Sequence, residues 1–388
     1  MSYIPSTLDE TGQMLSRIGV QSIEELFEDL PKDLRFPQLD LAKSSSEMEV
    51  LRELEAFAGE NVTADTYRWF LGAGAYDHFI PSAIPALASR GEFLSAYTPY
   101  QPEVSQGTLQ AIFEYQSMIA ELTGMEAVNA SHYDGATALA EAVLMGLRGS
   151  DENKRILLPQ SLHPEYRRGH SKLLSAFDVI IEEYEGRPAD AAKGKGDLAA
   201  LVAAYPDFYG RIADLEGASD AAHAAGGILI VHSDPIMLGL CKSPGAWGAD
   251  VVTAEGQSLG NDLSYGGPYL GVMATTKDLV RRLPGRIVGE ARDSEGRRGF
   301  VLTLVAREQH IRRERALSNI CSNQGLATLS SCIYLALMGK AGLKGVAELC
   351  WHRAHYAADR IASLARLSAV SRKSFENSWY RHPSKPSS

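Results

Sequence analysis

Short apolar runs alternate with helical stretches through the middle of the chain, between residues 107 and 275. Strands that are covered on both faces read as continuous apolar runs, and their alternation with helices is typical of a parallel sheet. The pattern therefore predicts an α/β fold, with a mostly parallel sheet and helices on both of its faces. The expected helices are Thr108–Leu122 and 135–147, and the expected strands are Arg155–Leu158, Asp178–Tyr184, Leu198–Tyr205, Gly227–His232, Asp250–Ala254 and Tyr269–Ala274.

The flanking regions have a different pattern. Residues 1–65 predict an N-terminal arm of short helices, because three hydroxyl residues each precede a glutamate by three positions, as in a capping box. Residues 66–325 form the expected large domain, and 326–365 are expected helices leading to a smaller domain, within helical runs at about 317–338 and 344–365. Residues 366–388 are rich in serine and basic residues, which predicts a disordered tail. The three capping boxes are Thr7-x-x-Glu10, Ser22-x-x-Glu25 and Ser46-x-x-Glu49.

Composition narrows the function classes. The 388 residues are 45% hydrophobic and 22% charged, with a formal net charge of −10. An acidic chain argues against general nucleic-acid binding, which needs a basic face. We see no apolar stretch near the roughly 20 residues that span a membrane. Four cysteines without a CxxC pair suggest reduced thiols in a cytoplasmic protein, and no metal-ligand pattern stands out.

The segment Asn129–Ala138 is the first candidate site. Gly135 permits a tight turn before a helix, whose free N–H groups can hold a phosphate. Thr137 would add a hydroxyl, and His132 lies in the same segment. A plain Asp-Gly turn before a helix fits the same residues.

Two more candidates follow expected strands, where open α/β sheets bind their ligands. Asp234 follows the expected strand Gly227–His232 and could pair with a cationic ring nitrogen, as at sites for pyridoxal phosphate (PLP). Capping of a helix by Asp234, with Pro235 in the first turn, is the simpler alternative.

The loop after the next strand is where a PLP enzyme carries its Schiff-base lysine, yet no lysine lies between Lys242 and Lys277. An amide or hydroxyl cannot form that imine.

Two segments around residues 71–81 and 97–107 are rich in Gly, Pro and Tyr. Rings and hydrogen-bonding groups together would suit a ligand pocket, although an ordinary tyrosine-rich loop has the same composition. The candidate pocket residues are Tyr76, His78, Tyr97, Tyr100, Gln101 and Ser105.

The segment from Arg281 to Arg315 is basic, with ten arginines against five acidic residues. This asymmetry fits a docking face for an acidic partner, and equally a solvated surface whose charges pair with one another.

Several specific strings together resemble one family. Over about residues 1–365, the chain is similar to subunit 1, the alpha subunit, of glycine dehydrogenase (decarboxylating), the P-protein of the glycine cleavage system. The strings that carry the resemblance are Tyr97–Gly107, Asn129–Ala142, Gly266–Gly271, Leu283–Glu290 and Arg297–Gln324.

The resemblance implies the aspartate aminotransferase-like fold, PLP-dependent transferase fold type I. It implies an oxidoreductase subunit of a heterotetramer that decarboxylates glycine through PLP and transfers the aminomethyl group to the lipoyl group of the H-protein. PLP would be bound covalently by subunit 2, with Gln257 in the lysine's place here, so this chain alone would be inactive. The tyrosine-rich candidates would contribute across the interface to the pocket. A vestigial PLP site would comprise His132, Gly135, Thr137, Asp234 and Gln257.

Members of this family usually continue past Leu364 into a small α/β domain, and Ala365–Ser388 does not resemble its strands. We therefore expect a truncated or frameshifted end. Two alternatives stay open: a truncated, non-catalytic scaffold, and an independent PLP enzyme that uses Lys242 or Lys277.

Overall fold

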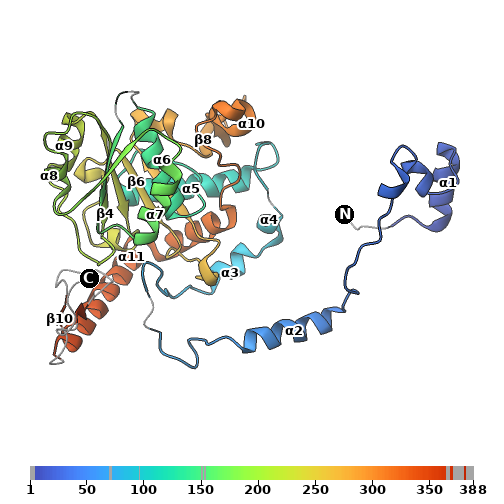
Figure 1. The fold of residues 1–388 in the computed structure, drawn as a ribbon, viewed down its shortest axis with the longest axis horizontal. Coiled ribbons are helices and arrows are strands. Elements are labelled where there is room, and N and C mark those ends of the chain that lie inside the picture. Colours follow the sequence, from blue (N-terminus) through green and yellow to red (C-terminus); the bar gives the residue numbers. More distant parts are fainter. Residues whose placement is uncertain are drawn as a thin grey trace. The chain divides into compact units, whose positions relative to one another are not determined.

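The computed structural model describes residues 5–69, 72–95, 97–149, 152, 154–363, 368–369 and 380–381 (Figure 1). The chain divides into two compact units, Met1–Phe70 and Leu71–Ser388.

The first unit contains helices α1 (Leu8–Ile18) and α2 (Glu47–Gly59), with single turns at Glu24–Phe27 and Lys32–Leu34 between them. Two of the three predicted capping boxes close in both directions, at Thr7 and at Ser46. The third, at Ser22, precedes only a 3₁₀ turn, in which the Glu25 N–H lies 3.4 Å from Ser22 Oγ. None of the residues described between 5 and 69 is buried.

A seven-stranded sheet organises the second unit, in the order β1-β7-β6-β5-β4-β2-β3. Strands β6, β5, β4, β2 and β3 run parallel, whereas β7 is antiparallel to both of its neighbours. The sheet is therefore mostly parallel, as the sequence predicts. Its strands are β1 (Ala127–Val128), β2 (Arg155–Pro159), β3 (Ile180–Tyr184), β4 (Leu198–Tyr205), β5 (Ile228–Ser233), β6 (Val251–Glu255) and β7 (Gly271–Thr275).

Burial on both faces explains why these strands read as apolar runs. In β4, Leu201 and Ala203 pack into one core cluster, and Ala200 and Val202 pack into another. Helices α6 and α7 cover the second face, while α5, α8, α9 and α11 pack on the first (Figure 1). The covering helices are α5 (Gln106–Thr123), α6 (Gly135–Leu147), α7 (Pro164–Leu174), α8 (Pro188–Ala192), α9 (Ala218–Ala224) and α11 (Gly325–Ala362).

Elements at the border of the sheet were harder to predict. The six expected strands form within two residues of their expected bounds, but β1 and the hairpin β8–β9 were missed. Strand β1 has only two residues, and the hairpin carries charged side chains, which conceal its alternation. The remaining elements are α3 (Ala83–Ala88), α4 (Gly91–Leu94), α10 (Gln309–Arg312), β8 (Ile287–Arg292) and β9 (Arg298–Thr303).

The expected C-terminal pair of helices is observed as α11, which is interrupted at Gly339, where φ is 57°. Residues 317–324, which we expected to be helical, precede it as a loop. Helix α11 alone among the described helices is long and apolar enough to cross a membrane, with mean hydropathy 1.4 over 18 residues, although no such stretch was expected. Core helices of globular domains can be equally long and apolar. Cys332, Leu335 and Leu343 of α11 pack into the core cluster on the first face of the sheet.

The acidic residues of the basic segment pair with arginines of the same segment. Each of its five acidic residues lies within ion-pair distance of an arginine of the same segment. The most enclosed pair is Arg286–Glu308, at 3.7 Å with both side chains 5% exposed. These contacts fit the self-paired surface, but they involve four of the ten arginines and leave the docking-face interpretation open.

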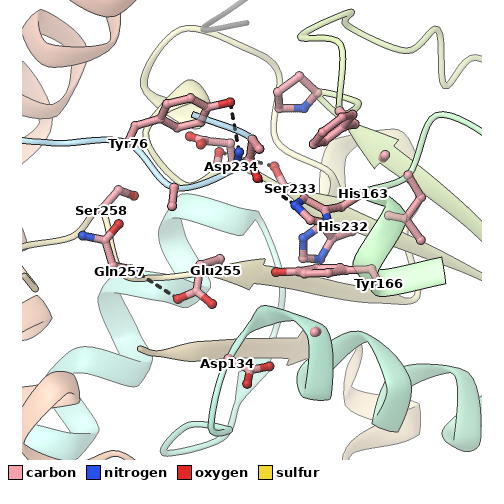
Figure 2. A pocket seen from close by; sticks show the side chains of 18 of the residues that line it. Tyr76, Asp134, His163, Tyr166, His232, Ser233, Asp234, Glu255, Gln257 and Ser258 are labelled. Carbon is pink, nitrogen blue, oxygen red and sulfur yellow. Dashed lines mark hydrogen bonds between the residues drawn. The ribbon is translucent and has the colours of Figure 1, made fainter. Parts of the chain in front are cut away.

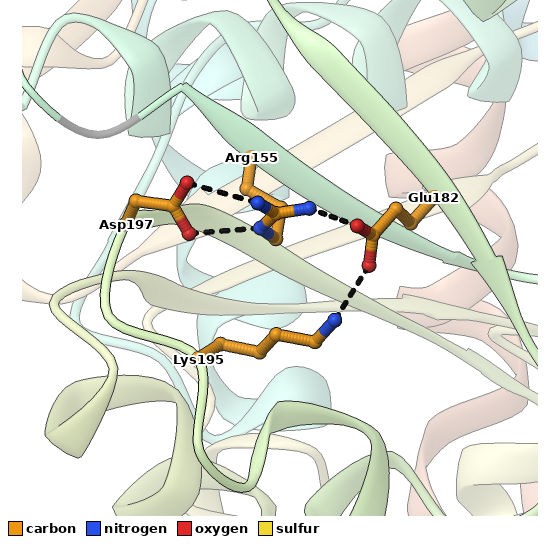
Figure 3. A network of polar contacts seen from close by, with 4 residues as sticks. All are labelled: Arg155, Glu182, Lys195 and Asp197. Atoms are coloured by element: carbon orange, nitrogen blue, oxygen red, sulfur yellow. Dashed lines mark hydrogen bonds and ion pairs between the residues drawn. The ribbon is translucent and has the colours of Figure 1, made fainter.

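An ion network ties the sheet together at the amino ends of its strands, away from the site described below. Arg155 of β2 binds both carboxylate oxygens of Asp197, at 2.8 and 3.1 Å, and also pairs with Glu182 of β3. Lys195 adds a contact of 2.7 Å to Glu182 (Figure 3). These charges occupy the end of the sheet opposite to the carboxyl ends of the parallel strands.

The predicted tail falls mostly outside the described residues. Of residues 364–388, the structure describes only an antiparallel pair of two-residue strands, β10 (Ser368–Ala369) and β11 (Tyr380–Arg381).

Candidate functional site

A cavity of about 340 Å³ opens at the carboxyl ends of β4, β5 and β6. Its walls come from the loops after these three strands, the first turns of α6 and α7, and the segment Ala73–His78 (Figure 2). This is the position where open α/β sheets bind ligands. Its polar lining residues are Tyr76, His78, Asp134, His163, Tyr166, Asp207, His232, Ser233, Asp234, Glu255, Gln257, Ser258 and Tyr269.

The structure brings four of the predicted site residues together in this cavity: Tyr76, His78, Asp234 and Gln257. Three others lie at its edge or outside it. Gly135 begins α6 beside the cavity, and the Thr137 hydroxyl is held by Asp134, at 3.0 Å from its carbonyl oxygen. His132 is 1% exposed and pairs through its backbone with Gly271, so its side chain does not line the cavity.

Asp234 performs the capping role considered from the sequence and also lines the cavity. Its Oδ1 accepts the Met237 N–H at 2.9 Å and so caps the turn that follows β5. The same side chain lines the cavity, where burial raises its pKa despite the nearby His78. A buried carboxylate facing the cavity would favour a cationic group over an anion.

Histidine and aromatic rings form one wall of the cavity. The rings of Tyr166 and His232 lie 5.3 Å apart, and those of His163 and Phe208 lie 4.9 Å apart. His163 Nε2 lies 2.7 Å from the Ala73 carbonyl, while its Nδ1 accepts the Glu165 N–H. Burial lowers the pKa of His232 to about 3 and also lowers that of His78, so these rings are neutral at pH 7.

Glu255, at the end of β6, accepts hydrogen bonds from three backbone N–H groups. Its Oε2 accepts the Gly135 N–H at 2.8 Å, and its Oε1 accepts the N–H groups of Gln257 and Leu270 at 3.0 and 3.1 Å. Burial raises its pKa to about 7, against the lowering effect of these three donors. Nearby Asp134 raises it further by like-charge repulsion.

Gln257 stands where the sequence analysis looked for a lysine. It is 5% exposed and lines the cavity, and its Nε2 donates to the Asn261 carbonyl at 2.6 Å. No lysine or arginine is among the described residues that line the cavity. The residues present therefore do not fit covalently bound PLP.

The other predicted pocket residues are dispersed. Tyr97 borders a second hollow of about 320 Å³ and its hydroxyl lies 3.2 Å from Ser322 Oγ. Tyr100 accepts a hydrogen bond from Arg286 at 3.1 Å. Gln101 is exposed, and Ser105 precedes α5 without a side-chain capping bond. None of these four residues lines the cavity described above.

His163 and Tyr166 line the cavity but were not candidates from the sequence, whereas His232 and Glu255 began candidate segments without being singled out. His232 ends a predicted strand and Glu255 directly follows one, which was an available signal, because a polar residue at that position faces the ligand side. His163 and Tyr166 lie at the start of α7, and no local pattern marks them. Among the described residues, no group of three or more His, Cys, Asp and Glu side chains is placed to hold a metal.

Comparison with known proteins gives consistent matches. The family model for the glycine cleavage system P-protein matches residues 1–387. A relative from Thermomicrobium roseum, a probable glycine dehydrogenase (decarboxylating) subunit 1, is 51% identical over 97% of this chain and 86% of its own length.

A crystal structure of glycine decarboxylase (P-protein) of the glycine cleavage system, in inhibitor-bound form, has a TM-score of 0.91. It is 44% identical, over all of this chain and 88% of that one. Lactobacillus brevis glutamate decarboxylase, at TM-score 0.64 and 13% identity over 90% of this chain and 81% of its own, is similar in fold alone.

Proposed function

The chain belongs to the glycine cleavage system P-protein family, and from this premise we propose that it completes a glycine-decarboxylating site together with subunit 2, which binds the cofactor. In this proposal, PLP is attached to a lysine of subunit 2, and the aminomethyl group passes to the lipoyl group of the H-protein. The chain would work in the cytoplasm, with glycine as the substrate of the assembly.

One observation carries the proposal: the cavity at the strand ends has Gln257 and no lysine in its described lining. A carboxamide nitrogen is not nucleophilic and cannot form an imine with an aldehyde. A chain of this family with that deficit needs a second polypeptide to supply the amine.

The contribution of this chain would come from side chains that it leaves uncovered. Tyr97 is 76% exposed and Tyr100 48% exposed, in the segment that precedes α5. Aromatic side chains of this exposure are suited to form part of a wall at a subunit interface. We propose that these two residues, with Gln101 and Ser105, border the partner's site, and that Tyr76 and His78 support it from the cavity side.

The direct test uses the purified chain, purified subunit 2, H-protein and PLP, and measures release of carbon dioxide from glycine. We expect activity only in the mixture, with a PLP absorption band that follows subunit 2. Glycine decarboxylation by this chain alone would refute the proposal.

The independent-enzyme alternative needs Lys242 or Lys277. The Lys242 Nζ lies over the Trp247 ring, 3.7 Å from its centroid, and Lys277 begins the turn after β7. Neither lines the cavity. Borohydride reduction of the PLP-treated chain, followed by peptide mapping, tests this alternative, and a specifically labelled lysine would favour it.

The scaffold alternative makes a different prediction for the same mixture. A chain that only binds subunit 2 would co-purify with it without raising its activity. In our proposal, Tyr97→Ala lowers kcat of the mixture by tenfold or more while the two subunits still co-purify. Tyr356→Ala, on exposed α11, is the matched control that leaves kcat unchanged.

A further inference from the structure

The amino terminus of α6 already has an anion bound to it, and that anion belongs to the chain itself. Glu255 takes N–H hydrogen bonds from three separate segments: the first residue of α6, the loop after β6 and the residue before β7. Figure 2 shows its carboxylate between Gln257 and the start of α6 near Asp134. Helix amino termini favour negative charge, and here that charge comes from a side chain 120 positions away.

Two other donors of this turn are also engaged. Asp134 Oδ1 accepts the Thr137 N–H at 2.7 Å, and the Asp134 carbonyl accepts the Ala138 N–H at 3.0 Å. Together with the Gly135 bond to Glu255, these contacts leave the helix end with two internal carboxylates in place of one external anion.

The start of α6 is also in close steric contact with the end of β6. A Cβ on Gly135 would lie 2.9 Å from the Glu255 backbone nitrogen and 3.0 Å from its Cβ. The helix end therefore packs directly on the end of β6, against backbone atoms of Glu255 as well as its Cβ.

The charged side chains around the cavity also disfavour a bound phosphate. Its described lining includes four carboxylate residues, Asp134, Asp207, Asp234 and Glu255, and no lysine or arginine. Asp207 pairs with Arg211 at 2.7 Å, but a phosphate dianion entering this cavity would meet no side-chain cation in the described lining.

We propose that Glu255 is a built-in anion that occupies the phosphate position of this subunit, so that the cavity excludes phosphorylated ligands independently of the missing lysine. Replacing Gln257 by lysine would then not restore cofactor binding, because the phosphate position would still be filled. The inference goes beyond the proposed function, since phosphate binding by this chain can be measured without subunit 2 or glycine.

The test is chemical rescue of the full-length chain at pH 8, where the Glu255 carboxylate is charged. Glu255→Ala removes the internal anion and opens space for inorganic phosphate. We expect this variant to unfold at a lower temperature than wild type, and millimolar phosphate to raise its Tm by ~2 °C relative to chloride at equal ionic strength. Wild type should show no phosphate-specific shift.

Two further variants make the result specific. Glu121→Ala removes an exposed carboxylate of α5 and should behave like wild type. Glu255→Gln keeps the volume of the side chain and should also give no phosphate response, because the position stays filled.

Three outcomes would overturn the inference: a phosphate-specific shift in wild type, a folded Glu255→Ala chain without one, or a response of Glu255→Gln equal to that of Glu255→Ala. If Glu255→Ala is unfolded, recovery of its native circular dichroism on adding phosphate supports the inference, and failure to recover contradicts it. None of these outcomes bears on whether subunit 2 supplies the lysine.

Discussion

The two units of the chain differ in how far they bury leucine side chains. In Leu71–Ser388, Leu201 of β4 is fully buried between the sheet and its covering helices. In Met1–Phe70, Leu54 of α2 is 57% exposed, and no described residue of that unit is buried. Both leucines belong to regular elements whose apolar pattern the sequence displays.

The difference shows what periodicity can establish. A repeated apolar position predicts a helix or strand and its inner face, but burial requires a second layer to pack against that face. The α/β unit has a sheet with helices on both faces, whereas the first unit has short helices and single turns. The predictions that follow test whether stability follows this layering.

The largest effect is expected in the core of the sheet. Leu201→Ala removes a side chain that is 0% exposed, so it should lower the free energy of unfolding by about 2–5 kcal/mol through lost burial and a residual cavity. Urea denaturation of the full-length chain measures this. A decrease in the free energy of unfolding of less than about 1 kcal/mol would mean that Leu201 is not buried in a packed core as described.

Glu255 adds a pH-dependent contribution to the same unit. Its pKa is raised from 4.5 to about 7 in the folded state, so the folded state holds the proton more tightly than the unfolded state does. The associated stability is fully present below pH 4.5 and is lost as the pH rises through about 7, a change of ~3 kcal/mol.

Unfolding free energies of wild type and Glu255→Gln at pH 4.5 and pH 8 test this dependence. Wild type should lose ~3 kcal/mol more than the variant between the two values. An equal change in unfolding free energy with pH in wild type and Glu255→Gln would contradict the raised pKa of Glu255.

The next effect concerns close packing around the site. A Cβ on Gly271 would lie 2.4 Å from the Asp134 carbonyl oxygen and 2.6 Å from His132 Cβ, so Gly271→Ala should destabilise the chain by about 1–3 kcal/mol. Gly345→Ala is the matched control, because nothing lies within 4 Å of its Cβ in α11. It should stabilise the chain slightly, and equal Tm shifts for the two variants would argue against the packing described.

The smallest effect is expected in the first unit. Leu54→Ala removes an exposed side chain and should change the free energy of unfolding of the isolated chain by less than about 0.5 kcal/mol. The comparison with Leu201→Ala uses the same substitution in the same measurement. A loss in Leu54→Ala as large as that in Leu201→Ala would show that the first unit has a core of its own or is covered.

Much of the α/β layer could be predicted, because burial on both faces leaves a direct mark on the sequence. Strand β4 forms over the expected residues Leu198–Tyr205, and α6 over the expected 135–147. The hairpin β8–β9 could not be predicted in this way. It packs on α5 through Val288 and Phe300, and charged residues such as Glu290 and Arg298 interrupt its apolar positions.

The candidate site was predicted unevenly for a similar reason. Asp234 and Gln257 follow strands, so the rule that ligands bind at strand ends was enough to find them. Tyr97 and Tyr100 come from a segment with the same composition as that of Tyr76, yet they lie away from the cavity. Composition does not determine the direction of a loop.

The sequence by itself determined the α/β class and the absence of a lysine between Lys242 and Lys277, since both depend on residue identity and local pattern. Only the tertiary structure decided that Glu255 would meet Gly135 and Leu270. Those contacts join segments far apart in the chain, and no local preference encodes them. They arise because the order of the strands places the end of β6 against the start of α6.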